Sequence, residues 1–181
     1  MSIKIIAIIQ ARMGSKRFPG KVMADLGGKP MLRFMLDRLR PLEDDDTHLW
    51  VLTTTEPADD VISDCLCHNE VIRCYRGSER DVLSRFRAIA PDYDVIVRLT
   101  GDCPLLTAGI VRYVLDAHEE FGGDYTALQV DGLNVQVYES DALMRIESTT
   151  WSREHVGPPL GECHVVFLPS LSVDTPEDLE R

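Results

Sequence analysis

Short apolar runs alternate with helix-like segments along the first two thirds of this chain, and this alternation limits its fold more than any other feature. The apolar runs predict strands at residues 3–9, 49–54, 71–75 and 94–99. Apolar residues at helical spacing predict helices at residues 31–39, 59–68, 78–91 and 110–121. This order favours an α/β fold with a mostly parallel sheet and helices on both faces. Ligands on such sheets bind beyond the carboxyl ends of the strands.

The last third has a different pattern. Residues 125–130 predict a fifth strand, and residues 131–138 alternate apolar and polar side chains, which predicts an edge strand or hairpin. We expect a helix at 142–146, a loop at 151–159, a final strand at 165–168 and the start of a helix at 176–181. With no internal repeat or linker visible, we expect a single domain over residues 1–181.

Charge and hydropathy exclude some classes of partner. The net charge of −11 gives no general attraction to nucleic acid or to an anionic membrane. No apolar run approaches the roughly eighteen residues of a membrane span. We interpret the apolar start as a buried strand rather than a processed leader, and expect a cytoplasmic location. The five cysteines lack a zinc-finger spacing, so we expect reduced and mostly buried thiols.

A basic turn, residues 10–21, follows the first predicted strand. It contains Arg12, Lys16, Arg17 and Lys21 within ten residues of an otherwise acidic chain. Gly14 lets backbone N–H groups approach phosphate oxygens, and the cations neutralise their charge. The pattern matches neither a Walker A loop nor G-x-G-x-x-G. An exposed charged loop is the alternative interpretation, so the identity of any anion stays open here.

Two carboxylates are candidates for metal binding. Asp102 follows the fourth strand in RLTGDCP, on the side where ligands bind, although a turn or cap role would also explain it. Asp174, in SVDTPEDLE, has a simpler explanation as a helix cap before Pro176.

Six segments together resemble the cytidylyltransferase family that includes the CMP-sugar-acid synthetases, and in particular its spore-coat polysaccharide branch. The matching segments are collinear, cover nearly the whole chain, and lie at residues 8–32, 76–86, 97–105, 131–138, 153–156 and 173–180. The resemblance implies a Rossmann-like nucleotidyltransferase sheet of the kind shared with A-type glycosyltransferases. It also implies transfer of CMP from CTP to a sugar acid or related small acceptor, with release of pyrophosphate, in surface polysaccharide biosynthesis.

The resemblance assigns roles by position. The nucleotide triphosphate would be wrapped by the basic turn, through Gln10, Ala11, Arg12, Gly14, Ser15, Arg17 and Lys21. Arg12, Lys21 and Asp102 would be catalytic, and Mg²⁺ would bind Asp102 and Asp174. The base or ribose would lie near Gly77 and Ser78, and the acceptor near Asp131, Arg153, Glu154 and His155. A homodimer is one assembly that the resemblance suggests.

The chain departs from the family pattern in two ways. Asn134 and Gln136 stand where the family usually has acids, and amides bind cations less strongly than carboxylates. The segments between residues 125 and 131 and between 155 and 173 are also shorter than in the family. These departures leave a second hypothesis open, a catalytically weak nucleotide-binding relative. A sugar-nucleotide glycosyltransferase is disfavoured, because Gly101-Asp102-Cys103 supplies no D-x-D metal motif.

Overall fold

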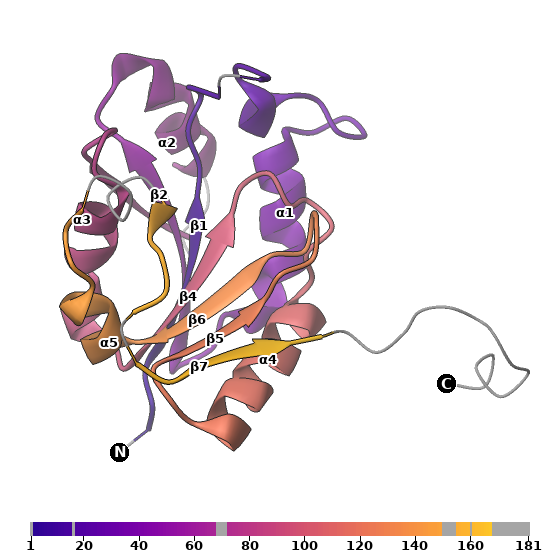
Figure 1. The fold of residues 1–181 in the computed structure, drawn as a ribbon. Coiled ribbons are helices and arrows are strands. Elements are labelled where there is room, and N and C mark those ends of the chain that lie inside the picture. The colour runs from indigo at the N-terminus through magenta and orange to yellow at the C-terminus, as the bar shows by residue number, and fades with distance from the viewer. Residues whose placement is uncertain (1, 16, 68–71, 150–154, 160, 168–181) are drawn as a thin grey trace, which may run out of the picture.

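A seven-stranded sheet forms the centre of the computed structural model, which describes residues 2–15, 17–67, 72–149, 155–159 and 161–167 (Figure 1). The strands lie in the order β3-β2-β1-β4-β6-β5-β7. Their bounds are β1 Ile5–Gln10, β2 Thr47–Thr54, β3 Arg73–Gly77, β4 Val95–Thr100, β5 Tyr125–Leu128, β6 Val135–Glu139 and β7 Cys163–Val166. Every neighbouring pair is parallel except those that β6 makes with β4 and β5.

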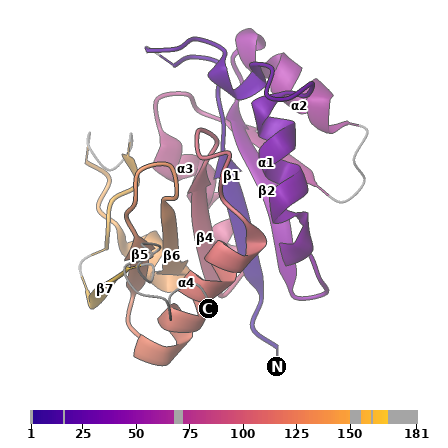
Figure 2. The ribbon, with the colours of Figure 1, turned by 90° about the vertical axis from the view of Figure 1, so that its right-hand side faces the viewer.

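In the part of the chain that the structure describes, five α-helices cover the two faces of the sheet (Figure 2). They are α1 Met31–Leu39, α2 Asp60–Leu66, α3 Val82–Arg87, α4 Ala108–Phe121 and α5 Ser140–Arg145. Buried side chains of α1, α2 and α4 pack in one apolar cluster on one face, and those of α3 and α5 pack in a second cluster on the other. None of the described helices is long and apolar enough to span a bilayer. The predicted α/β class, with a mostly parallel sheet covered on both faces, is confirmed.

The order of the strands reverses at β1. The chain runs from β1 through β2 to β3 on one side, and then crosses back to place β4 on the other side of β1. The carboxyl ends of β1 and β4 therefore diverge from a topological switch point, the usual ligand position in open α/β sheets.

Strand β6 forms an antiparallel hairpin with β5, which confirms one of the two alternatives predicted for residues 131–138, but it is not an edge strand. It lies inside the sheet, between β4 and β5, where Leu99 pairs with Val135. Its alternation has another cause. Val135 and Val137 are fully buried in the core, whereas the polar side chains of Asn134 and Gln136 line a pocket on the opposite side. Polar residues that line a pocket and polar residues that face solvent at a sheet edge give the same alternating pattern in a sequence.

Most element boundaries shift by one to three residues from the predictions, and the bounds of α1 agree with them. The N-cap of α3 is Asp81, whose carboxylate accepts a hydrogen bond from the Ser84 N–H at 2.9 Å. Ser78, where the predicted helix begins, accepts from the Asp81 N–H and lies before the helix. All five cysteines are free, but only Cys103 is buried, so the expectation of mostly buried thiols is wrong. The helix predicted at residues 176–181 lies outside the described residues.

Candidate functional site

The turns that follow β1 and β4 are joined directly to each other. Gln10 and Thr100 are paired in the sheet, and the Gly101 N–H donates to the Gln10 carbonyl at 2.9 Å. A Cβ on Gly101 would lie 3.0 Å from that oxygen and 3.2 Å from the Ala11 Cβ. Glycine is therefore the residue that lets the two turns approach so closely.

A buried carboxylate holds the basic turn in place through hydrogen bonds. Asp59, which is 2% exposed, accepts a hydrogen bond from the Met13 N–H at 2.7 Å and another from the Thr54 hydroxyl. The turn closes on itself where the Gly20 N–H donates to the Met13 carbonyl at 2.9 Å. Gly20 has a φ of 73°, a value that favours glycine, and a 3₁₀ turn, Lys21–Met23, follows it. These contacts fix the position of Lys21.

Lys21 and Asp102 meet between the two turns. The Lys21 Nζ lies 2.6 Å from the Asp102 Oδ2. Burial would raise the pKa of Asp102, but the hydrogen bonds and positive charge that it receives, mainly from Lys21, lower the pKa below its usual value of 3.8. The carboxylate is therefore ionised at neutral pH and remains 41% exposed. An ionised, accessible carboxylate next to an ammonium group can bind a cation that also contacts phosphate.

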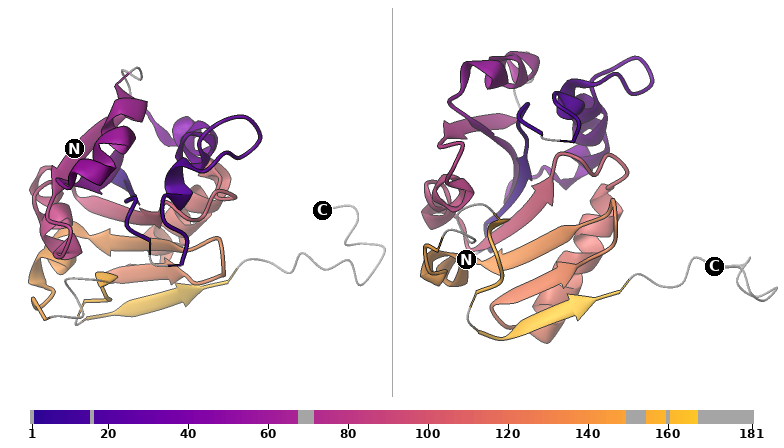
Figure 3. Two further views of the ribbon diagram at one scale, coloured as in Figure 1. Left: turned by 90° about the horizontal axis from the view of Figure 1, so that it is seen from above. Right: turned by 45° about the horizontal axis from the view of Figure 1, so that its top comes forward.

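A pocket of about 450 Å³ lies over this pair. The turns that carry the two residues follow the carboxyl ends of β1 and β4 (Figure 3). The pocket collects most of the residues predicted to bind the nucleotide and one predicted to lie near the acceptor. Its lining residues are Gln10, Arg12, Ser15, Arg17, Lys21, Val22, Thr100, Gly101, Asp102 and His155. We call it the phosphate pocket. Three of these side chains, Arg12, Arg17 and Lys21, carry the positive charge that suits an anion.

The remaining predicted nucleotide-binding residues lie around the phosphate pocket. Ala11 is buried against Gly101. A Cβ on Gly14 would lie 3.3 Å from Glu79, the acid that pairs with Arg12 at 3.7 Å. Gly77 and Ser78 follow at the carboxyl end of β3. The structure therefore places Ala11 and Gly14 on the loop after β1, and Gly77 and Ser78 at the carboxyl end of β3, with β2 between these two strands.

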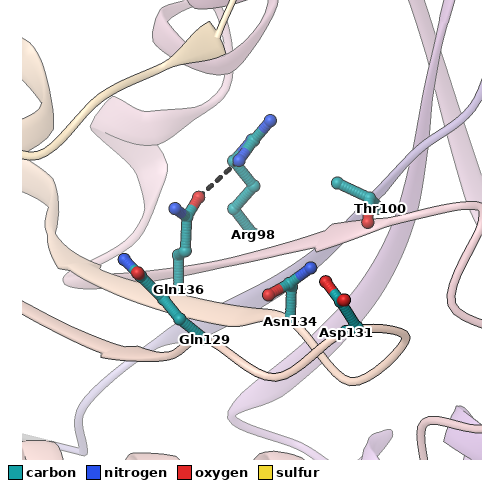
Figure 4. Close-up of a pocket in the computed structure, with 6 residues that line it drawn as sticks. All are labelled: Arg98, Thr100, Gln129, Asp131, Asn134 and Gln136. Carbon is teal, nitrogen blue, oxygen red and sulfur yellow. Dashed lines mark hydrogen bonds between the residues drawn. The ribbon is translucent and has the colours of Figure 1, made fainter. Parts of the chain in front are cut away.

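A second pocket, of about 430 Å³, is lined by polar residues of β4, β6 and the loop between β5 and β6 (Figure 4). We call it the amide pocket, and its lining is Arg98, Thr100, Gln129, Asp131, Asn134 and Gln136. Thr100 lines both pockets, and the Arg98 Nε donates to Gln10 of the phosphate pocket at 3.2 Å. The two pockets are therefore neighbours. Asp131 lies in the amide pocket, whereas His155 lines the phosphate pocket.

Several predicted residues lie outside the described part of the chain. They are Lys16, Arg153, Glu154 and Asp174. Among the described residues, no group of three His, Cys, Asp or Glu side chains is arranged to hold a metal ion. Asp102 is thus the carboxylate of the phosphate pocket that fits Mg²⁺, which needs only one or two protein carboxylates when phosphate oxygens and water complete its shell.

Three structurally important residues were missed in the sequence. Asp59 stands at the start of the helix predicted at residues 59–68, but its carboxylate makes no cap and supports the basic turn instead. Arg98 is the charged residue in the otherwise apolar run of β4. Its presence in a buried strand could have indicated a polar pocket beside that strand. Arg85 on α3 is 1% exposed, and its Nε and Nη1 have no hydrogen-bond partner in the described structure. Burial lowers the pKa of Arg85 to about 10.

The family model for cytidylyltransferases matches residues 6–163. This chain belongs to the cytidylyltransferase family. Among solved structures, a cytidylyltransferase from Leptospira borgpetersenii superposes with a TM-score of 0.83 at 30% identity, covering 99% of this chain and 84% of that one. A CMP:2-keto-3-deoxy-manno-octonic acid synthetase complexed with CTP has the same fold, with a TM-score of 0.63 at 18% identity, covering 98% and 95%.

Two curated relatives of this cytidylyltransferase-family chain have informative names. The spore coat polysaccharide biosynthesis protein SpsF of Bacillus subtilis is 33% identical over 97% of this chain and 83% of its own length. A 3-deoxy-manno-octulosonate cytidylyltransferase of Haemophilus influenzae is 32% identical over 68% of this chain and 48% of its own length. The cytidylyltransferase resemblance inferred from the sequence is confirmed.

Proposed function

We propose that this chain transfers CMP from CTP to a sugar acid or a related small acceptor and releases pyrophosphate, in surface polysaccharide biosynthesis. The observation that carries the proposal is the contact of Lys21, from the basic turn after β1, with Asp102, from the turn after β4. Cations and a carboxylate converge there on one pocket, as a triphosphate with a bound cation requires. The name of the relative 3-deoxy-manno-octulosonate cytidylyltransferase supports the choice of CTP and of a sugar acid. The name of SpsF, a spore coat polysaccharide biosynthesis protein, supports a role in polysaccharide biosynthesis.

The basic turn would bind the triphosphate. Arg12, Arg17 and Lys21 donate charge-assisted hydrogen bonds to phosphate oxygens, which are stronger than neutral ones. They also stabilise the charge that grows on the departing pyrophosphate. Asp102, together with Asp174 outside the described residues, would hold Mg²⁺, which supplies further neutralisation of the phosphate charge when bound.

The acceptor would occupy the amide pocket and reach the α-phosphorus past Thr100, the residue common to both pockets. An acceptor oxygen forms a bond to the α-phosphorus while the bond to pyrophosphate breaks, and the proton of the acceptor oxygen is released. Catalysis here is positioning and electrostatic stabilisation, and needs no covalent enzyme intermediate. The predicted cytoplasmic location and homodimer stay predictions.

Pyrophosphate release tests this function. Each of the four nucleoside triphosphates is combined with a panel of sugar acids and phosphonates that includes 3-deoxy-manno-octulosonate, with Mg²⁺ present. We expect release with CTP and an acid, and loss of at least a hundredfold in kcat for Asp102→Asn, with the far-UV circular dichroism unchanged. CTP binding without release from any mixture would instead favour the second hypothesis, a weak nucleotide-binding relative. Wild-type rates in Asp102→Asn would remove Asp102 from the site.

A further inference from the structure

Arg98 projects from β4 into the amide pocket with neutral partners on every side that the structure describes. Its Nε donates to the Gln10 Oε1 at 3.2 Å, and its Nη1 donates to the Gln136 Oε1 (Figure 4). Among the described residues, no carboxylate lies within ion-pair distance of it. A partly buried guanidinium is normally paired with an acid, because an unpaired charge in that position loses hydration without compensation. The charge of Arg98 is therefore available to a ligand.

The two tyrosines near Arg98 do not neutralise it. Tyr138 and Tyr125 are 0% and 3% exposed, and burial raises the pKa of both phenols. Both stay protonated at neutral pH and carry no charge. Asp102 acts on Arg98 only through its longer-range field, and is itself paired with Lys21.

Gln136 is oriented by Arg98. A guanidinium can only donate, so the amide oxygen of Gln136 faces it. The NH₂ group of Gln136 is turned away from Arg98 (Figure 4). This end of the pocket therefore combines the guanidinium with amide groups of Gln136 and Gln129 (Figure 4).

The Arg98 guanidinium also has N–H groups that bond to neither glutamine. Of its five N–H groups, one is used by Gln10 and one by Gln136, which leaves three. A planar carboxylate can accept two parallel N–H bonds from a guanidinium, a geometry that lysine cannot provide. Asp131 supplies the carboxylate of this lining, on the loop before β6, so the pocket has a cationic and an anionic wall.

We propose that Arg98 binds the carboxylate of the acceptor, and that the neutral side chain of Gln136 is what leaves Arg98 free to do so. The inference rests on the proposed function in one respect, the assignment of the amide pocket to the acceptor. It makes Arg98 the residue that selects acids over neutral sugars. An acid at position 136 would occupy the guanidinium and close the carboxylate site.

The substitution Gln136→Glu tests this directly. It keeps the size of the side chain and its hydrogen bond to Arg98, and adds one negative charge. Val61→Glu, on the exposed surface of α2, is the control with the same change in net charge. The Arg98 Nε–H signal is followed by ¹⁵N NMR while 3-deoxy-manno-octulosonate, glucuronate or neutral glucose is added in the presence of CTP. Arg98→Lys is a second variant, in case Gln136→Glu does not fold.

We expect at least one of the two acids to shift the Arg98 signal saturably, and glucose to leave it unchanged. Affinity for that acid is measured by calorimetric titration, since Arg98→Lys has no Arg98 signal. It should fall at least tenfold in Gln136→Glu and in Arg98→Lys, and stay within twofold of wild type in Val61→Glu. CTP is kept saturating in every variant, because Arg98 also contacts Gln10 of the phosphate pocket. The proposal is overturned if neither acid shifts the signal, if glucose shifts it equally, or if Gln136→Glu binds the acid as wild type does.

Pyrophosphate release measured in the same samples separates the two proposals. An acid that engages Arg98 but supports no release with CTP would contradict the proposed function and leave the Arg98 assignment standing. Release that is equally efficient in wild type and Gln136→Glu would contradict the Arg98 assignment and leave the function standing.

Discussion

At the scale of single residues, the pairing of Lys21 with Asp102 sets the protonation of the phosphate pocket. The pKa of Asp102 is lowered, so its ionised form is the one that folding favours. This contribution is present above the unfolded pKa of Asp102 and is lost only as pH falls through the lower folded pKa. Between pH 5 and 8 the carboxylate stays ionised, and no change in activity over that range should come from Asp102.

Lys21→Met should raise the pKa of Asp102, because the charge and hydrogen bond that lower it are removed while the burial that raises it remains. A ¹³C NMR titration of the Asp102 carboxyl group measures this change. Lys29→Met is the control, since Lys29 pairs with Asp37 instead. An Asp102 titration that is the same in wild type and Lys21→Met would contradict the account of this pair.

At the scale of the elements, the basic turn depends on the start of α2 through Asp59, whose neighbour Asp60 has a different environment and does not contact the turn. Asp59 is buried and accepts bonds from Met13 and Thr54, whereas Asp60 is exposed and pairs with Arg76 at the surface. Asp59→Ala should lower the free energy of unfolding by about 1–3 kcal/mol, because it leaves buried donors unpaired. Asp60→Ala should change it by less than about 1 kcal/mol. Urea denaturation of both variants checks this, and equal losses would contradict it.

Two glycines offer a similar contrast. An alanine methyl at Gly101 would press on the Gln10 carbonyl and on Ala11, so Gly101→Ala should destabilise the protein by about 1–3 kcal/mol. At Gly109, in α4, an added Cβ would lie 3.8 Å from its nearest neighbour, the Thr107 hydroxyl oxygen. Gly109→Ala should therefore raise the free energy of unfolding by up to about 1 kcal/mol, because alanine has the higher helix propensity. Thermal unfolding of both variants measures the difference. The same sign of change in both would be inconsistent with the packing described here.

The individual elements also show which parts of the fold can be predicted from the sequence alone. Strong apolar periodicity predicts α1 with its observed bounds, and the alternation of strands and helices predicts the parallel sheet. The interior place of β6 could not be predicted, because strand order depends on long-range pairing that periodicity does not record. The role of Asp59 was equally hidden, since an acid at a helix start and an acid that holds a distant turn look the same in a sequence.

At the scale of the whole molecule, the switch point of the sheet brings two turns together from residues 10–21 and 100–102. Basic residues on one turn and Asp102 on the other were predictable individually, from their positions after strands. Their meeting in one pocket required the pairing of β1 with β4. The adjoining amide pocket required β6 to lie beside β4. The central claim is therefore that the β1 and β4 turns form one triphosphate site.

Calorimetric titration of CTP into wild type, Lys21→Met and Lys29→Met tests that claim most directly, because it needs no acceptor. We predict one CTP bound per chain and wild-type affinity in Lys29→Met. In Lys21→Met the affinity should fall roughly ten- to a hundredfold, because a charge-assisted hydrogen bond of about 1.5–3 kcal/mol is lost. Equal affinity in all three proteins, or no binding of CTP to wild type, would contradict the account.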